Sequence, residues 1–143
     1  MDRISNRFLV AGAVLSALAA LLHLGCIVFG ASWYRFLGAG EKMAQMDLAG
    51  HWYPTVATLV ISSMLLLWSA FALSGAGLIR NLPLTRLALS AITGIYLLRG
   101  VAFTPLMAYF PGNSATFWFW SSATCLAVGA VHLIGLWQVW RRL

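Results

Sequence analysis

The stretch FLVAGAVLSALAALLHLGCIVF, residues 8–29, contains no charged side chain. At about 1.5 Å per residue, a helix of this length crosses a hydrocarbon core of about 30 Å. Its most polar side chains are Ser16 and His23. The stretch therefore predicts a transmembrane helix, and its uninterrupted length argues against a cleaved signal peptide, whose apolar region is shorter.

Three further apolar stretches follow, separated by segments rich in proline, glycine or charge. None of them alternates apolar and polar residues as the strands of a membrane barrel do, so helices are expected throughout. Short connections make consecutive helices antiparallel neighbours. The sequence predicts an all-α membrane protein, a single domain of four transmembrane helices in an up-down-up-down bundle, at residues 8–29, 53–77, 84–104 (ending before Pro105) and 115–139.

The predicted connection over residues 30–51 is the longest and the only one with mixed charge. Within it, residues 41–48 carry Met43 and Met46 three positions apart, which favours a short helix in the membrane interface. Aromatic rings settle at the headgroup level and mark the ends of spans. We expect an outer belt of Trp33, Tyr34, Trp52, Tyr53, Tyr109, Trp118 and Trp120, and an inner one of Trp137 and Trp140.

Composition and charge support the same class of protein. The chain is 62% hydrophobic and 8% charged, which is too few charges for a soluble exterior. The net charge of +6 does not indicate nucleic acid, because the basic residues sit at the ends of the apolar stretches. Their positions predict both termini in the cytoplasm and a place in the cell inner membrane: Arg3, Arg7, Arg80, Arg86, Arg141 and Arg142.

Small and polar residues follow one another at helical spacing in the first and fourth stretches. Such stripes let helix backbones approach closely and keep polar side chains away from lipid. We expect the two stripes to form the packed interior: Gly12, Ser16, Ala19, His23, Cys26 and Gly30 in the first, and Ser122, Cys125, Gly129 and His132 in the fourth.

Counting along the helices places His23, Arg99 and Cys125 at one height, about 20 to 23 Å from the inner ends. Thr58 reaches the same zone. His132 lies roughly 10 Å lower, so the two intramembrane histidines cannot flank one haem, and no cofactor is expected. The sequence predicts an outward-facing pocket whose ligand-binding residues are Arg99, His23, Thr58 and Cys125, with His51 and Glu41 at its mouth.

Each of these residues has a purely structural alternative. Arg99 either extends its side chain to the outer headgroups or faces the bundle and binds an anion. His23 either joins two helices through hydrogen bonds or exchanges protons with a cavity. The sequence does not decide between the two alternatives for Arg99 or between those for His23.

Catalytic patterns are absent from the sequence, and no carboxylate lies within a predicted span. The function predicted is therefore non-enzymatic binding of a small amphipathic or anionic molecule, such as a lipid. One alternative is an assembly protein without a ligand, which forms homo-oligomers. Another is redox chemistry or copper handling, for which the sequence offers thiols and soft ligands: Cys26, Cys125, Met43, Met46 and His51.

Overall fold

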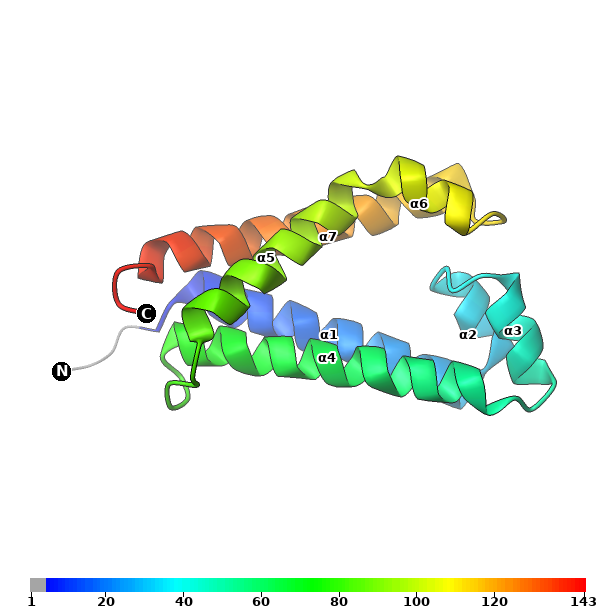
Figure 1. The fold of residues 1–143 in the computed structure, drawn as a ribbon, viewed down its shortest axis with the longest axis horizontal. Coiled ribbons are helices and arrows are strands. Elements are labelled where there is room, and N and C mark those ends of the chain that lie inside the picture. Colours follow the sequence, from blue (N-terminus) through cyan, green and yellow to red (C-terminus); the bar gives the residue numbers. More distant parts are fainter. Residues whose placement is uncertain (1–4) are drawn as a thin grey trace.

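The computed structural model describes residues 5–143, and the regular secondary structure in this range is helical (Figure 1). Three long helices and one of intermediate length carry the fold, and three short helices lie toward one end. In chain order the helices are α1 (Arg7–Phe29), α2 (Ala31–Phe36), α3 (Glu41–Leu48), α4 (Trp52–Ala76), α5 (Thr85–Val101), α6 (Phe103–Tyr109) and α7 (Ala115–Val139). The short helix predicted at residues 41–48 is present as α3.

Helices α1, α4 and α7 are each long and apolar enough to cross a membrane, and α5 with α6 makes a fourth candidate span. Many large apolar side chains lie on the outside of these helices. Leu21, Val28 and Leu67, for example, are 59%, 76% and 54% exposed. A continuous apolar exterior of this kind suits lipid and not water. The structure is therefore that of an all-helical protein with three or four spans that fit a membrane.

The fourth candidate span is broken, whereas the sequence predicted one helix over residues 84–104 that ends before Pro105. α5 ends at Val101, and α6 leaves it at an angle of 73°. Proline has no N–H to donate to the carbonyl four residues earlier, and its ring crowds that carbonyl, which here belongs to Val101. Pro105 itself lies in the first turn of α6, where a missing N–H costs little.

The long helices form two pairs that meet at one end and diverge toward the other (Figure 1). α1 packs along α4, and α5 packs along α7. We call the end where α1 begins and α7 ends the base, and the end that carries α2, α3 and α6 the far end. Asn6, which precedes α1, links three helices at the base. Its side chain donates to Gln138 of α7 at 2.8 Å, and its N–H donates to the Ala76 carbonyl of α4 at 3.1 Å.

Glycines allow the helices to approach closely. A Cβ atom on Gly135 would lie 3.0 Å from the backbone nitrogen of Leu9, which joins α7 to α1 at the base. A Cβ atom on Gly129 would lie 3.1 Å from the backbone nitrogen of Leu97, which joins α7 to α5. The predicted stripes are buried at six of their ten positions: Gly12, Ser16, Cys26, Ser122, Gly129 and His132.

Polar side chains in the interior link the helices across their interfaces. Ser69 of α4 donates to the Ala13 carbonyl of α1 at 2.8 Å. The hydroxyl oxygens of Ser16 in α1 and Tyr96 in α5 lie 2.9 Å apart, within hydrogen-bond distance. Trp68 places its edge against the Tyr96 ring, with the ring centroids 5.2 Å apart. Hydrogen bonds between helices supply association energy that apolar contacts alone do not provide in lipid.

Two aromatic residues depart from the predicted belts. Tyr34 and Trp118 are 1% and 4% exposed, so both are part of the interior. By contrast, Trp52, Trp120 and Trp137 are each at least 66% exposed, as residues of a belt should be.

The close approach of α5 and α7 can be tested with a pair of glycine substitutions. In Gly129→Ala the new methyl group meets the Leu97 backbone, and we expect a loss of about 1 to 3 kcal/mol in the free energy of unfolding. Gly94→Ala is the matched control, because a Cβ atom there has no described neighbour within 4 Å. Unfolding in mixed detergent, followed by circular dichroism, measures both variants. An equal loss in the two would contradict the proposed contact.

Candidate functional site

A cavity of about 750 Å³ lies at the far end, between α3, the start of α4 and the turn after α6. Its wall is mainly apolar and aromatic, and polar groups are added by Glu41, Lys42 and His51. Volumes between about 300 and 1,000 Å³ are typical of small-molecule pockets. The apolar part of the lining consists of Met43, Met46, Trp52, Tyr53, Tyr109, Phe110 and Pro111, with Ala39 and Gly40 beside them.

Two contacts connect the walls of this cavity across the helix pairs. The Asn113 side chain donates to the Gly38 carbonyl at 3.1 Å. Gly38 also packs against the ring of Phe117 at the start of α7. Gly38 has a positive φ of +76°, a backbone conformation that is strained for any residue with a side chain. The loop between α2 and α3 is thereby attached to α7.

A small core beneath α2 and α3 supports the cavity from below. Cys26, Ala31, Tyr34 and Ala44 form this core and are each less than 9% exposed. The Thr58 hydroxyl donates to the Pro54 carbonyl at 2.8 Å and lies 3.2 Å from the Tyr34 hydroxyl oxygen. Burial raises the pKa of Tyr34, so its hydroxyl is neutral at physiological pH. Thr58 therefore holds α2 against α4 and does not line the cavity.

Glu41, at the rim of the cavity, is already paired. Arg35 donates to both of its carboxylate oxygens, at 2.7 and 2.8 Å, and Gln45 donates to one of them at 2.6 Å. The Arg35 guanidinium, followed by the Gln45 amide, lowers the pKa of Glu41 to about 2. Since the Glu41 charge is compensated, Lys42 is the rim charge without an ion-pair partner among residues 5–143.

Arg99 lies between α5 and α7. It donates through Nη2 to the Ser121 hydroxyl at 2.8 Å, and its guanidinium carbon lies 5.3 Å from the centre of the Trp118 ring. Its Nη1 is buried and has no hydrogen-bond partner within the described part of the chain. The Arg99 side chain is thus held against α7. In the alternative considered from the sequence, it would extend freely to the headgroups.

The two intramembrane histidines, His23 of α1 and His132 of α7, lie at different heights in the bundle. His23 is half-buried and donates from Nδ1 to the Ala19 carbonyl at 2.8 Å. His132 is fully buried, and its ring lies against Gly12, 11 residues before His23 in the same helix. Eleven residues of helix rise by about 16 Å. His132 is therefore lower than His23, as the sequence predicted, but the separation is larger than the predicted 10 Å or so.

The structure therefore groups the six predicted site residues only in part. Glu41 and His51 both line the cavity at the far end. Arg99 and Cys125 belong to the pair α5 and α7, whereas His23 and Thr58 belong to the pair α1 and α4. No described hydrogen bond or ring contact joins Arg99 to His23. Cys26 and Cys125 are free thiols on different helices.

Most of the cavity lining was not predicted as a site. Trp52, Tyr53 and Tyr109 were assigned to a membrane belt, and Met43 and Met46 were considered as soft metal ligands. Lys42 lies in the connection with mixed charge, and the sequence predicted no role for it. A usable signal was present in the clustering of methionine and aromatic residues within the longest connection and directly after it, a composition typical of adaptable apolar binding surfaces.

The contact between Arg99 and Ser121 can be measured by a double-mutant cycle. Ser121→Ala leaves a part-buried charged donor without its acceptor, and we expect a loss of about 1 to 3 kcal/mol in the free energy of unfolding. In an Arg99→Met background the same replacement should cost less than about 0.5 kcal/mol, because the donor is gone. Detergent unfolding provides both values. An identical cost in the two backgrounds would show that the two side chains do not interact.

Comparison with protein-family models, curated proteins and solved structures finds no match for this chain. Its function is therefore inferred from its own cavities, charges and buried polar groups.

Proposed function

We propose that this chain is a non-enzymatic membrane protein that binds a small amphipathic molecule in the cavity at its far end. The observation that carries the proposal is the cavity itself, which has the volume of a ligand pocket and an apolar wall with a polar rim. A molecule with one apolar part and one charged group fits this division. Long-chain carboxylates and single-chain phospholipids are examples of this class.

The charged residues at the rim indicate the sign of the ligand's charge. Arg35 and Glu41 neutralise each other, which leaves Lys42 as the rim charge without a partner among the described residues. His51 is exposed beside it. Lys42 is a cation and His51 offers a second hydrogen-bonding group, so the rim favours a ligand with a carboxylate or phosphate over one with a cationic head group. The proposed ligand is therefore anionic at its polar end.

The proposal includes a membrane orientation. We count α5 and α6 as one span, which gives four spans in up-down-up-down order. Arg7, Arg80, Arg86, Arg141 and Arg142 lie at the ends of helices that meet at the base. By the positive-inside rule the base faces the cytoplasm and the far end faces outward, as expected for a protein of the cell inner membrane.

In this proposal the predicted site residues have different roles. Glu41, with Lys42 and His51, forms the polar rim. Thr58 supports Tyr34 beneath α3, and Arg99 stabilises the contact of α5 with α7. The assembly alternative gains no particular support, because Gly12 and Gly129 already contact other helices of the same chain.

Photolabelling tests the cavity directly. The protein is placed in phosphatidylcholine nanodiscs with a palmitate that carries a diazirine near its chain end, and the labelled peptides are identified by mass spectrometry. We expect labels at the apolar lining residues Met43, Met46, Trp52, Tyr53, Tyr109, Phe110 and Pro111. Met46→Trp fills the cavity and should lower this labelling about tenfold, which corresponds to 1.4 kcal/mol of binding.

Met64→Trp is the matched control, because Met64 lies on the outer surface of α4 and is 47% exposed. It should leave the labelling of the cavity unchanged. Lys42→Gln should weaken the labelling by palmitate but not by the corresponding uncharged methyl ester. Labels spread evenly over the lipid-facing helices, with no effect of Met46→Trp, would overturn the proposal.

A second candidate function is supported by the soft ligands of the same cavity. Met43, Met46 and His51 all line it, although they come from α3 and the residue before α4. Two thioethers and an imidazole are a donor set that suits Cu(I). Cys26, the fourth soft ligand considered from the sequence, is buried in the core beneath α2 and α3 and does not line the cavity.

Competition for Cu(I) with bicinchoninate under reducing conditions tests this candidate. If the protein binds Cu(I) here, Met43→Ile with Met46→Ile should weaken the affinity at least about tenfold, or 1.4 kcal/mol. The control replaces two methionines outside the cavity, Met64→Ile with Met107→Ile, and should have no effect. A protein that leaves all Cu(I) with the chelator would eliminate the copper candidate and leave the amphipath proposal intact.

A further inference from the structure

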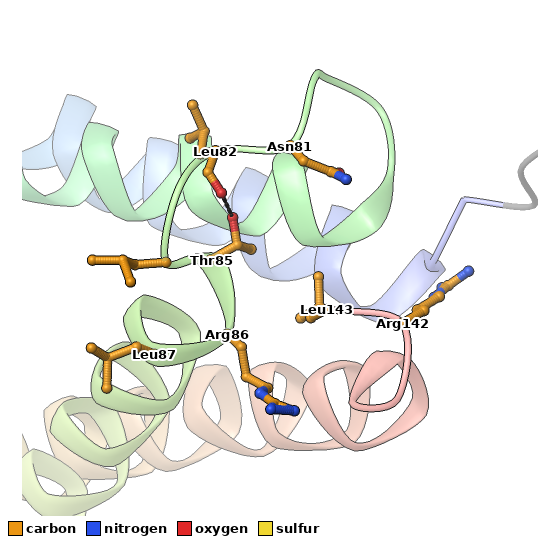
Figure 2. A pocket seen from close by; sticks show the side chains of 8 residues that line it. Asn81, Leu82, Thr85, Arg86, Leu87, Arg142 and Leu143 are labelled. Carbon is orange, nitrogen blue, oxygen red and sulfur yellow. Dashed lines mark hydrogen bonds between the residues drawn. The ribbon is translucent and has the colours of Figure 1, made fainter.

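A second cavity, of about 380 Å³, lies at the base (Figure 2). It is formed by the segment before α5, the first turn of α5 and the residues that follow α7. Figure 2 shows Arg86 reaching from α5 toward α7, with Arg142 on the other side of Leu143. Asn81 and Thr85 are its remaining polar residues. Two arginines from separate parts of the chain therefore line one cavity on either side of Leu143, and the Arg142 side chain points away from Arg86.

No side-chain carboxylate lies at this cavity. None of the described residues that line it has an acidic side chain, and neither Arg86 nor Arg142 has an ion-pair partner in residues 5–143. The two described side-chain carboxylates, Glu41 and Asp47, lie in α3 at the far end. Arginines bind phosphate well because their planar groups present several donors in a fixed arrangement.

Two features prepare the cavity for an anion. The guanidinium carbon of Arg86 lies 4.8 Å from the centre of the Trp140 ring, which restricts the side chain without using its hydrogen-bond donors. α5 begins beside it with no side-chain cap, so first-turn N–H groups and the positive end of the helix dipole face this region.

The surroundings are those of a membrane surface. Leu84 and Leu87 line the cavity and are 74% and 65% exposed, and Trp140 is 45% exposed. Apolar side chains and an indole next to arginines, at the end of apolar spans, match the layer in which lipid phosphates meet acyl chains. We propose that the base cavity binds the phosphate of an anionic phospholipid through Arg86 and Arg142. This proposal does not depend on the ligand proposed for the far end.

Native mass spectrometry of the full chain in detergent tests the proposal. Phosphatidylglycerol, phosphatidylcholine and inorganic phosphate are added separately, and the bound fraction is measured. We expect phosphatidylglycerol to bind at least about tenfold more tightly than phosphatidylcholine, and inorganic phosphate to bind more weakly than phosphatidylglycerol. Arg86→Gln with Arg142→Gln should lower phosphatidylglycerol binding about tenfold.

The control variant removes the same charge from the same end. Arg80 and Arg141 do not line the cavity, so Arg80→Gln with Arg141→Gln should lower binding less than about twofold. Equal losses in the two double variants would overturn the site in favour of general attraction to basic residues. Phosphate that binds through Arg86 and Arg142 while phosphatidylglycerol does not would overturn the lipid as its source.

Folding of each variant is checked by its circular dichroism and unfolding midpoint. Should the Arg86 and Arg142 double variant not fold, Arg142→Gln alone decides the question, because Arg142 lies beyond the end of α7. It should lower phosphatidylglycerol binding about threefold, and Arg141→Gln should leave it unchanged. No difference between these two single variants would overturn the proposal.

Discussion

Close backbone contact between α1 and α7 at the base is the constraint on which the arrangement of the helices depends. Apolar side chains gain little by leaving lipid, so packing at van der Waals distance and hydrogen bonds must hold the spans together. Gly135 supplies the packing against Leu9, and Asn6 supplies the hydrogen bond to Gln138. Because this joint lies at one end, the helix pairs diverge beyond it and need separate connections at the far end.

The sequence predicts well what depends on local pattern. The apolar stretches correspond to α1, α4 and α7, the stripes of small residues contain Gly12 and Gly129 but not Gly135, and residues 41–48 form α3. The break at Val101 was missed, although Pro105 was recognised as a helix signal. A proline ends the hydrogen-bond ladder of one helix and is tolerated in the first turn of the next, so its position alone does not decide between a stop and a bend.

The candidate site was harder to predict, because its lining comes from two segments more than 50 residues apart, 39–53 and 109–111. Counting along helices gave Arg99 and His23 a common height, but height does not say which neighbour a side chain faces. Arg99 instead contacts Ser121 and Trp118 of the helix it packs along. Trp118 had been assigned to a belt because its position near a helix end is compatible with either lipid or the interior, and only tertiary contacts separate the two.

The two cavities differ in which helices form their walls. At the far end, α3 and the start of α4 form one wall, and Tyr109 to Pro111 form the other. At the base, residues 81–87 face residues 142 and 143. Helices of 25 residues separate the two ends by about 37 Å, so a ligand in one cavity cannot touch a ligand in the other. The walls of the far cavity belong to different helix pairs, however, so any rotation of the pairs about the contact of Gly135 with Leu9 changes the distance between those walls. A ligand that holds the start of α5 to the end of α7 would act within one pair and leave the joint between the pairs unchanged.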